Sequence, residues 1–390
     1  MSPFNRYLEK RKTKQSYEVI SQRGCFSKKI VTVVIPIKNE YPLFLKTLES
    51  IYKSALAYNL LDFIHVVCVI NNRKNDADLI KENNLQSIKV LQNFDSQCFL
   101  SKISIDIINC VYEDFAFDEN QGVGLARKIG LDYGIEIKSE ILACLDADTL
   151  VAEDYCKLLF DFWKENSKKN ALAVTDFIHL TGENLEEENA IQKYQNYMKS
   201  HSKKLQKTGT WFYPVALGPT IICTSEAYVA CGGMNLKLAG EDFYFLQSLI
   251  KVCFGKVHFL NTTVYPSSRQ SDRVPFGTGR TISELLSNND KKLGYPDKCY
   301  EAIYDFISEV NIFIEKRFSL TNEIPDLSCL LKVKNIYLYN FLEKENFFNI
   351  WIKLCENNKN AQSLERAFHG WFDGLKIIRL IHFIESELPD

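Results

Sequence analysis

Three short apolar runs constrain the fold of this chain more than any other feature. Val31–Ile37, Phe63–Ile70 and Ile141–Leu145 are rich in β-branched and aliphatic residues, which is typical of strands buried on both faces of a parallel sheet. Segments with the apolar spacing of an amphipathic helix lie between them, such as Leu43–Leu56. This strand–helix alternation predicts βαβ units, a mainly parallel sheet and therefore an α/β fold.

The chain divides by pattern into three parts. Residues 1–29 are polar and basic and predict a solvated N-terminal arm, for which contact with an anionic membrane surface is the weaker alternative. Residues 30–280 carry the strand–helix alternation. Residues 281–390 have apolar positions three and four apart and indicate an all-helical C-terminal region. We expect the aromatic residues of this region to pack in its core, and the alternative is an amphipathic face on a membrane or a partner.

Composition narrows the class of protein. With 390 residues, 46% hydrophobic residues and a net charge of −2, the chain is typical of a globular protein and has no basic excess for binding nucleic acid. The 12 cysteines show no disulfide or zinc spacing, which predicts reduced thiols and a cytoplasmic location. No apolar run reaches the roughly 20 residues that span a bilayer, so any membrane contact is expected to be peripheral, at the inner face.

Two carboxylates follow the third run. A strand places residues i and i+2 on one face, so Asp146 and Asp148 can point the same way at the strand end where α/β sheets bind ligands. Neighbouring carboxylates repel, and Mn²⁺ or Mg²⁺ shared with a substrate diphosphate would suit two hard oxygen ligands. The alternative is ordinary capping, because Asp148 and Thr149 precede a helical stretch.

Polar loops also follow the first two runs. Lys38 and Glu40 come after the first, and Asn71 comes at the end of the second. Because the ends of parallel strands meet at one edge of a sheet, these loops and the Asp pair could form one nucleotide site. Each loop alone is equally well explained by capping.

The order of five motifs resembles that of the family 2 glycosyltransferases, of the bacterial, non-processive type, which have the GT-A fold. The motifs are Val31–Glu40, Asn120–Arg127, Leu145–Asp148, Gly232–Met234 and Gly240–Asp242. No single motif is specific, and the resemblance, which covers roughly residues 30–270, depends on their joint order and spacing.

This resemblance implies an inverting, divalent-metal-dependent glycosyltransferase. It would move a sugar from a nucleotide-diphospho-sugar to a hydroxyl group of a glycan or glycolipid, in cell-surface synthesis. Residues 30–150 would hold the donor, and residues 151–280 would supply the base and the acceptor surface. The donor residues implied are Pro36, Lys38, Glu40, Asn71, Asn120, Gly122, Arg127, Asp146, Asp148, Arg269 and Arg273.

The same resemblance assigns the chemistry. Asp148 and Asp146 would bind Mn²⁺ or Mg²⁺, and Asp242 would be the general base with Glu241 as its neighbour. Trp211 and Tyr213 are candidate sugar-stacking residues for the acceptor. Arg269 and Arg273 could clamp the diphosphate, and the alternative for both is solvated surface arginine.

Some features depart from the family pattern. The second run ends in Asn71-Asn72, where the family commonly has acidic residues, so the nucleotide preference is open. The Gln-x-x-Arg-Trp motif of processive synthases is absent, which favours single addition. Two rival functions are a non-catalytic sugar-nucleotide binder or scaffold and, with less support, a nucleotidyltransferase. The latter usually has a glycine-rich basic loop after the first strand, where this chain has Ile37–Glu40.

Overall fold

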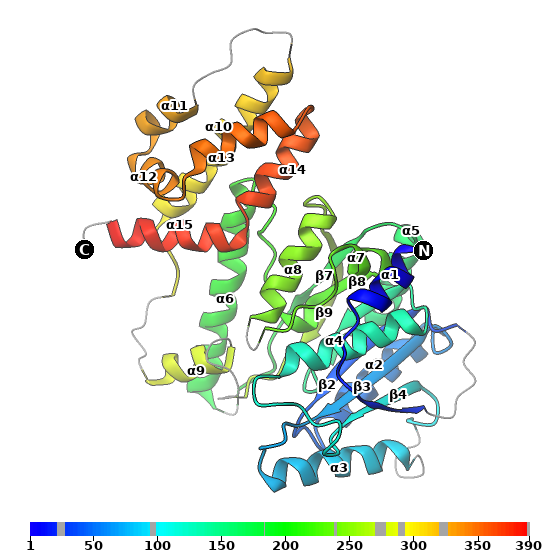
Figure 1. The fold of residues 1–390 in the computed structure, drawn as a ribbon. Coiled ribbons are helices and arrows are strands. Elements are labelled where there is room, and N and C mark those ends of the chain that lie inside the picture. Colours follow the sequence, from blue (N-terminus) through cyan, green and yellow to red (C-terminus); the bar gives the residue numbers. More distant parts are fainter. Residues whose placement is uncertain are drawn as a thin grey trace. The chain divides into compact units, whose positions relative to one another are not determined.

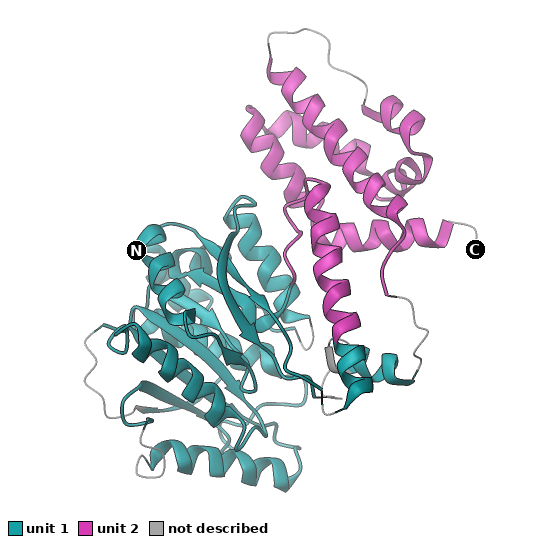
Figure 2. Ribbon diagram, turned by 180° about the vertical axis from the view of Figure 1, so that it is seen from behind, with its two compact units in different colours: residues 1–191, 216–287 teal, residues 192–215, 288–390 magenta. Residues whose placement is uncertain are grey.

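The computed structural model of the chain consists of two compact units. It describes residues 1–21, 28–93, 99–182, 184–237, 240–269, 278–287, 293–319 and 327–387. Unit 1 comprises Met1–Ile191 and Ala216–Ser287, and unit 2 comprises Gln192–Val215 and Asn288–Asp390 (Figure 2). This division differs from the boundaries expected from sequence, because residues 192–215 group with the C-terminal helices.

A mixed sheet organises unit 1. Within the described residues it has nine strands in the order β1-β4-β3-β2-β5-β8-β7-β9-β6. They are β1 (Glu18–Ser21), β2 (Val31–Ile37), β3 (Ile64–Asn71), β4 (Ser104–Cys110), β5 (Ile141–Cys144), β6 (Leu150–Val151), β7 (Leu172–Phe177), β8 (Ile221–Thr224) and β9 (His258–Tyr265). The central strands β4, β3, β2 and β5 are parallel neighbours, whereas β8 runs antiparallel to both β5 and β7.

Burial explains the sequence pattern of the central strands. Every residue of β3 and all of β2 except Pro36 are buried, which is why both read as continuous apolar runs. The helices of this unit are α1 (Pro3–Lys10), α2 (Phe44–Ala57), α3 (Asp78–Gln92), α4 (Val123–Glu136), α5 (Tyr155–Asn166), α7 (Ser225–Ala230), α8 (Glu241–Val252) and α9 (Thr278–Ser287) (Figure 1). Among them, α4 packs on β2 and β3. The predicted α/β fold with a helical C-terminal part is confirmed.

Unit 2 is helical and has an aromatic core. Its helices are the later part of α6 (Leu185–Lys207), α10 (Asp297–Phe318), α11 (Leu327–Lys334), α12 (Ile336–Lys344), α13 (Phe347–Asn357), α14 (Ala361–Trp371) and α15 (Gly374–Glu387). The buried Phe306 ring lies 4.9 Å from Phe347, 5.2 Å from Phe368 and 4.8 Å from Phe372, measured between centroids. These rings are all buried, as expected for packing residues.

Three local expectations differ from the structure. The N-terminal arm contains α1 and β1, which pairs antiparallel with β4. Helix α3 continues to Gln92, into the stretch 87–102 that was expected to be irregular, because Ile88 and Leu91 are buried on its inner side. Residues 258–265 form one strand instead of two short ones, with a register irregularity at Thr175/Asp176 of β7. Within the described part of the chain, no helix is long and apolar enough to cross a membrane.

The aromatic core of unit 2 should dominate its stability. We expect Phe306→Ala to lower the free energy of unfolding by about 3–5 kcal/mol, because truncation leaves a cavity among three rings. Tyr304→Ala, at a position 53% exposed in the same helix, should change it by no more than about 0.5 kcal/mol. Urea unfolding followed by tryptophan fluorescence measures both, and equal effects of the two variants would contradict this packing.

Candidate functional site

The loops after three adjacent strands meet at one edge of the sheet. β3, β2 and β5 are parallel neighbours, so the loops after Asn71, Ile37 and Cys144 leave the sheet side by side. Lys38 Nζ lies 2.6 Å from an oxygen of Asp76, whose carboxylate also accepts the backbone N–H of Arg73 at 2.7 Å. The side chain of Asp76, which sequence reasoning did not single out, therefore joins the first two loops.

The predicted donor residues of these loops occupy different environments. Asn71 is buried, and its backbone carbonyl oxygen accepts a hydrogen bond of 2.9 Å from the Asn84 side chain. Pro36 is half-buried in β2 and Asn120 is exposed. Gly122 directly precedes α4. Their assignment to the nucleoside stays a prediction.

Arg127 joins carboxylates from two distant segments. Its side chain lies in α4 and is 4% exposed. One terminal nitrogen, Nη2, lies 2.6 Å from Asp146 Oδ1. The other, Nη1, lies 2.6 Å from Glu241 Oε1 and also pairs with Asp242. The structure thus brings the predicted metal-binding Asp146 and the predicted base Asp242 to one guanidinium group.

The electrostatic environment places the pKa of Asp242 near neutrality. Burial raises its pKa to about 7, and the charges of Glu241 and Asp146 add to the rise, while Arg127 and a hydrogen bond from the Gly218 backbone oppose it. Burial acts to lower the pKa of Arg127, but the three carboxylates outweigh it and hold that pKa well above its ordinary value. A carboxylate titrating near neutrality beside a permanent cation suits a general base.

Gly218 is part of this arrangement, although no sequence motif indicated a role for it. A Cβ atom at Gly218 would lie 2.3 Å from Arg127 Nη2 and 2.9 Å from Asp242 Oδ2. A side chain there would therefore push the guanidinium and the carboxylate apart. The Gly218-Pro219 pair between the aromatic loop and β8 was the only sequence signal for this position.

A second arginine pairs with the remaining acidic residues. Arg269 bonds both carboxylate oxygens of Glu40 through Nη2, which also lies 2.9 Å from Asp148 Oδ2. Burial raises the pKa of Asp148 to about 6, the charges of Asp146 and Glu40 add to the rise, and Arg269 opposes it. The structure therefore brings Glu40, Asp148 and Arg269 together, and their assignment to the nucleoside, the cation and the diphosphate stays a prediction. Arg273 lies outside the described residues.

We call these seven residues the charged site: Glu40, Arg127, Asp146, Asp148, Glu241, Asp242 and Arg269. Five carboxyl groups face two guanidinium groups, so the site carries an excess of negative charge when all are ionised. The side chains of Asp146, Asp148 and Asp242 are 34%, 22% and 23% exposed, so a ligand can reach them from solvent.

A divalent cation would have two carboxylate ligands in this site and is held most fully when a ligand supplies further oxygen atoms. Asp146 and Asp148 offer the carboxylate oxygens that Mg²⁺ and Mn²⁺ prefer. Among the described residues, however, no group of three or more His, Cys, Asp or Glu side chains could hold a metal ion. The donor set suits an ion bound by two carboxylates and completed by phosphate oxygens, a common arrangement for Mg²⁺.

The two candidate acceptor aromatics belong to unit 2, whereas the charged site lies wholly in unit 1. Trp211 stacks on His369, with ring centroids 4.2 Å apart and an interplanar angle of 18°, so one face of its indole is already covered. Tyr213 is partly buried, and this burial raises its pKa. Their role in acceptor binding stays a prediction.

Comparison with known proteins gives distant structural similarity alone. No protein-family model and no curated protein matches the chain. Residues 1–349 of S. aureus TarS in complex with UDP-GlcNAc match at 15% identity and a TM-score of 0.43, over 79% of this chain and 78% of that one. Those residues without ligand match at 14% identity and a TM-score of 0.41, over 82% and 91%. Because these TM-scores lie below 0.5, the function proposed below is argued from the site.

The burial of Arg127 leads to a test by stability. We expect Arg127→Gln to lower the free energy of unfolding by about 3–5 kcal/mol, because three carboxylates lose their buried partner. Without the cation, the pKa of Asp242 rises further, so the folded variant binds more protons than its unfolded chain and loses stability as pH rises. The loss relative to wild type should therefore be larger at about pH 8 than at about pH 5.

Arg73→Gln is the matched control for this variant. The Arg73 guanidinium donates to the backbone carbonyl of Gln121 at 2.8 Å, so its removal should cost less and show little dependence on pH. Chemical denaturation at the two pH values measures both variants. A pH-independent loss for Arg127→Gln would contradict the electrostatic role given to this residue.

Proposed function

We propose that this protein is a glycosyltransferase of GT-A type that transfers a sugar from a nucleotide-diphospho-sugar to a hydroxyl group of a glycan or glycolipid. The observation that carries the proposal is the shared guanidinium of Arg127, which holds Asp146 of the Asp-x-Asp pair and Asp242 together. Glycosyl transfer to a hydroxyl requires a leaving-group site and a base close to each other, and this pairing supports both.

Asp242 is proposed to act as the general base. The acceptor hydroxyl gives its proton to the Asp242 carboxylate as its oxygen bonds to the anomeric carbon, and the bond from that carbon to the diphosphate breaks. A pKa of about 7 leaves Asp242 partly ionised at neutral pH and basic enough to accept the proton. One base opposite one leaving group implies a single displacement with inversion at the anomeric carbon.

Asp146 and Asp148 are proposed to hold a divalent cation together with the donor diphosphate. When bound, such a cation offsets the negative charge that develops on the departing nucleoside diphosphate. Glu40 and the loops after β2 and β3 would hold the nucleoside beside it. In this arrangement Arg269 offsets part of the negative charge of Glu40 and Asp148 before ligand arrives, because it pairs with both.

Asp242→Asn provides the test of the reaction. Wild-type protein with Mn²⁺ should release a nucleoside diphosphate from at least one sugar nucleotide when glycan or glycolipid acceptors are supplied. The rate should rise with pH through about pH 7 and then level off, because the base must be ionised. Asp242→Asn should lower kcat by about 10²–10⁴-fold.

The control is Asp78→Asn, at a side chain 93% exposed in α3, which should leave the rate unchanged. Full activity in Asp242→Asn would overturn the role of the base. Calorimetric binding of a sugar nucleotide without turnover would instead support a non-catalytic binder.

Arg269→Gln tests the cation site without any donor. Because Arg269 occupies two carboxylates of the charged site, its removal should leave them to a metal ion. We expect the affinity for Mn²⁺ alone to increase by about tenfold, a change of about 1.4 kcal/mol. Calorimetry or the electron paramagnetic resonance of free Mn²⁺ measures this affinity.

Arg280→Gln is the control, since Arg280 pairs with Glu284 in its own helix at 2.8 Å. An unchanged or weaker Mn²⁺ affinity in Arg269→Gln would contradict a cation site at Asp148.

A further inference from the structure

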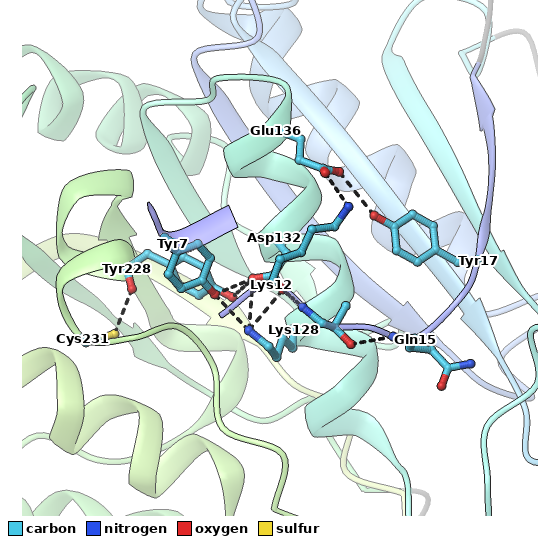
Figure 3. Close-up of polar contacts among 10 residues, drawn as sticks. Tyr7, Lys12, Gln15, Tyr17, Lys128, Asp132, Glu136, Tyr228 and Cys231 are labelled. Carbon is cyan, nitrogen blue, oxygen red and sulfur yellow. Dashed lines mark hydrogen bonds and ion pairs between the residues drawn. The ribbon is translucent and has the colours of Figure 1, made fainter. Parts of the chain in front are cut away.

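The N-terminal segment, residues 1–21, docks on the helix that carries Arg127. Figure 3 shows Tyr7 of α1 pointing into a polar cluster formed with Lys128 and Asp132 of α4 and Tyr228 of α7. Tyr7 is 3% exposed and Asp132 is fully buried. A residue of the segment expected to be solvated is therefore a core residue of unit 1.

Half of the hydrogen-bond donors to Asp132 come from this segment. Its carboxylate accepts the Tyr7 hydroxyl at 2.6 Å, the Tyr228 hydroxyl at 2.7 Å and the Thr13 backbone N–H at 2.9 Å. Lys128 Nζ lies 3.1 Å from the same carboxylate and donates to the Tyr7 oxygen at 2.9 Å. Burial and the charge of Asp132 raise the pKa of Tyr7, so the phenol stays a donor. A buried carboxylate that loses donors is costly, so the cluster is complete only with the segment in place.

Gly233, between α7 and α8, makes room for Tyr7. Gly233 has φ +82°, and a Cβ atom there would lie 2.0 Å from the Tyr7 hydroxyl oxygen. The Gly232–Met234 motif, noted in the sequence for its order alone, therefore has a physical role at the Asp132 cluster through Gly233. The chain continues through Asn235, whose side chain donates to the backbone carbonyl of Glu241 at 3.1 Å.

The cluster and the charged site share one turn of α4. Lys128 directly follows Arg127, and successive residues of an α-helix point about 100° apart. Lys128 therefore enters the Asp132 cluster, while Arg127 reaches the three carboxylates of Asp146, Glu241 and Asp242. Any rotation or shift of this turn moves both side chains together.

We propose that Tyr7 is a positioning residue for the charged site, acting through α4. Its hydroxyl fixes Lys128 and Asp132, these fix the turn that carries Arg127, and Arg127 fixes the position and the charge of Asp242. The catalytic consequence rests on the proposed function, whereas the structural link between Tyr7 and the charged site does not.

The test compares Tyr7→Phe with Tyr17→Phe. Both remove one hydroxyl from the N-terminal segment, but the Tyr17 hydroxyl bonds Glu136, one turn further along α4 and away from Arg127. In Tyr7→Phe, hydrogen–deuterium exchange should become faster in peptides that cover residues 123–128 and 241–245. Tyr17→Phe should leave these peptides as in wild type.

The pH profile of turnover is the second readout. Because Arg127 lowers the pKa of Asp242, a weaker Arg127–Asp242 ion pair should raise this pKa. The acidic limb of the pH–rate profile should then move to higher pH. At about pH 7 we expect kcat to fall by about tenfold in Tyr7→Phe with the donor KM nearly unchanged, equivalent to about 1.4 kcal/mol. A residue that only stabilised the fold would lower the melting temperature without moving this limb.

The outcomes separate the two proposals. If wild-type protein turns over no sugar nucleotide, the proposed function fails, and the exchange data alone decide the role of Tyr7. If wild-type protein is active while Tyr7→Phe matches Tyr17→Phe in exchange and in pH profile, the positioning role is refuted and the proposed function stands.

Discussion

The pairing of one buried guanidinium with three carboxylates constrains unit 1 more than any other interaction. Arg127 is 4% exposed, and a buried charge is tolerated only when its partners are fixed around it. These partners come from the end of β5 and the start of α8, so α4, the sheet edge and α8 must be placed with respect to one another. The charge network thus determines how this part of the chain packs.

Local pattern was sufficient for the central sheet because its strands are buried on both faces. The run Val31–Ile37 is the strand β2 without any change of bounds, and the Asp pair does follow a parallel strand, β5. Local pattern failed for α1, whose burial depends on Asp132, 125 residues away in sequence. A short polar helix carries no signal for such a contact.

The sequence indicated individual residues of the charged site, but not the ion pairs that connect them. The motifs pointed to Asp146, Asp148, Glu241 and Asp242 separately, yet no spacing in the sequence indicates that Arg127 would join three of them. Gly218 was missed for the same reason. Only the folded structure shows that a side chain at this position would collide with Arg127 and Asp242. Trp211 was chosen for its aromatic ring, whereas its stacking partner, His369, lies in a distant helix.

Helix α6 begins in unit 1 and ends in unit 2. Unit 2 is built from an internal stretch and the C-terminal region, which contact each other through His201 and Tyr300 at 2.7 Å. The helical unit therefore depends on a stretch of chain that lies within the sequence of unit 1. Shortening the gene after codon 287 would remove the C-terminal part of unit 2 and leave residues 192–215 without their partners there, such as Tyr300 for His201.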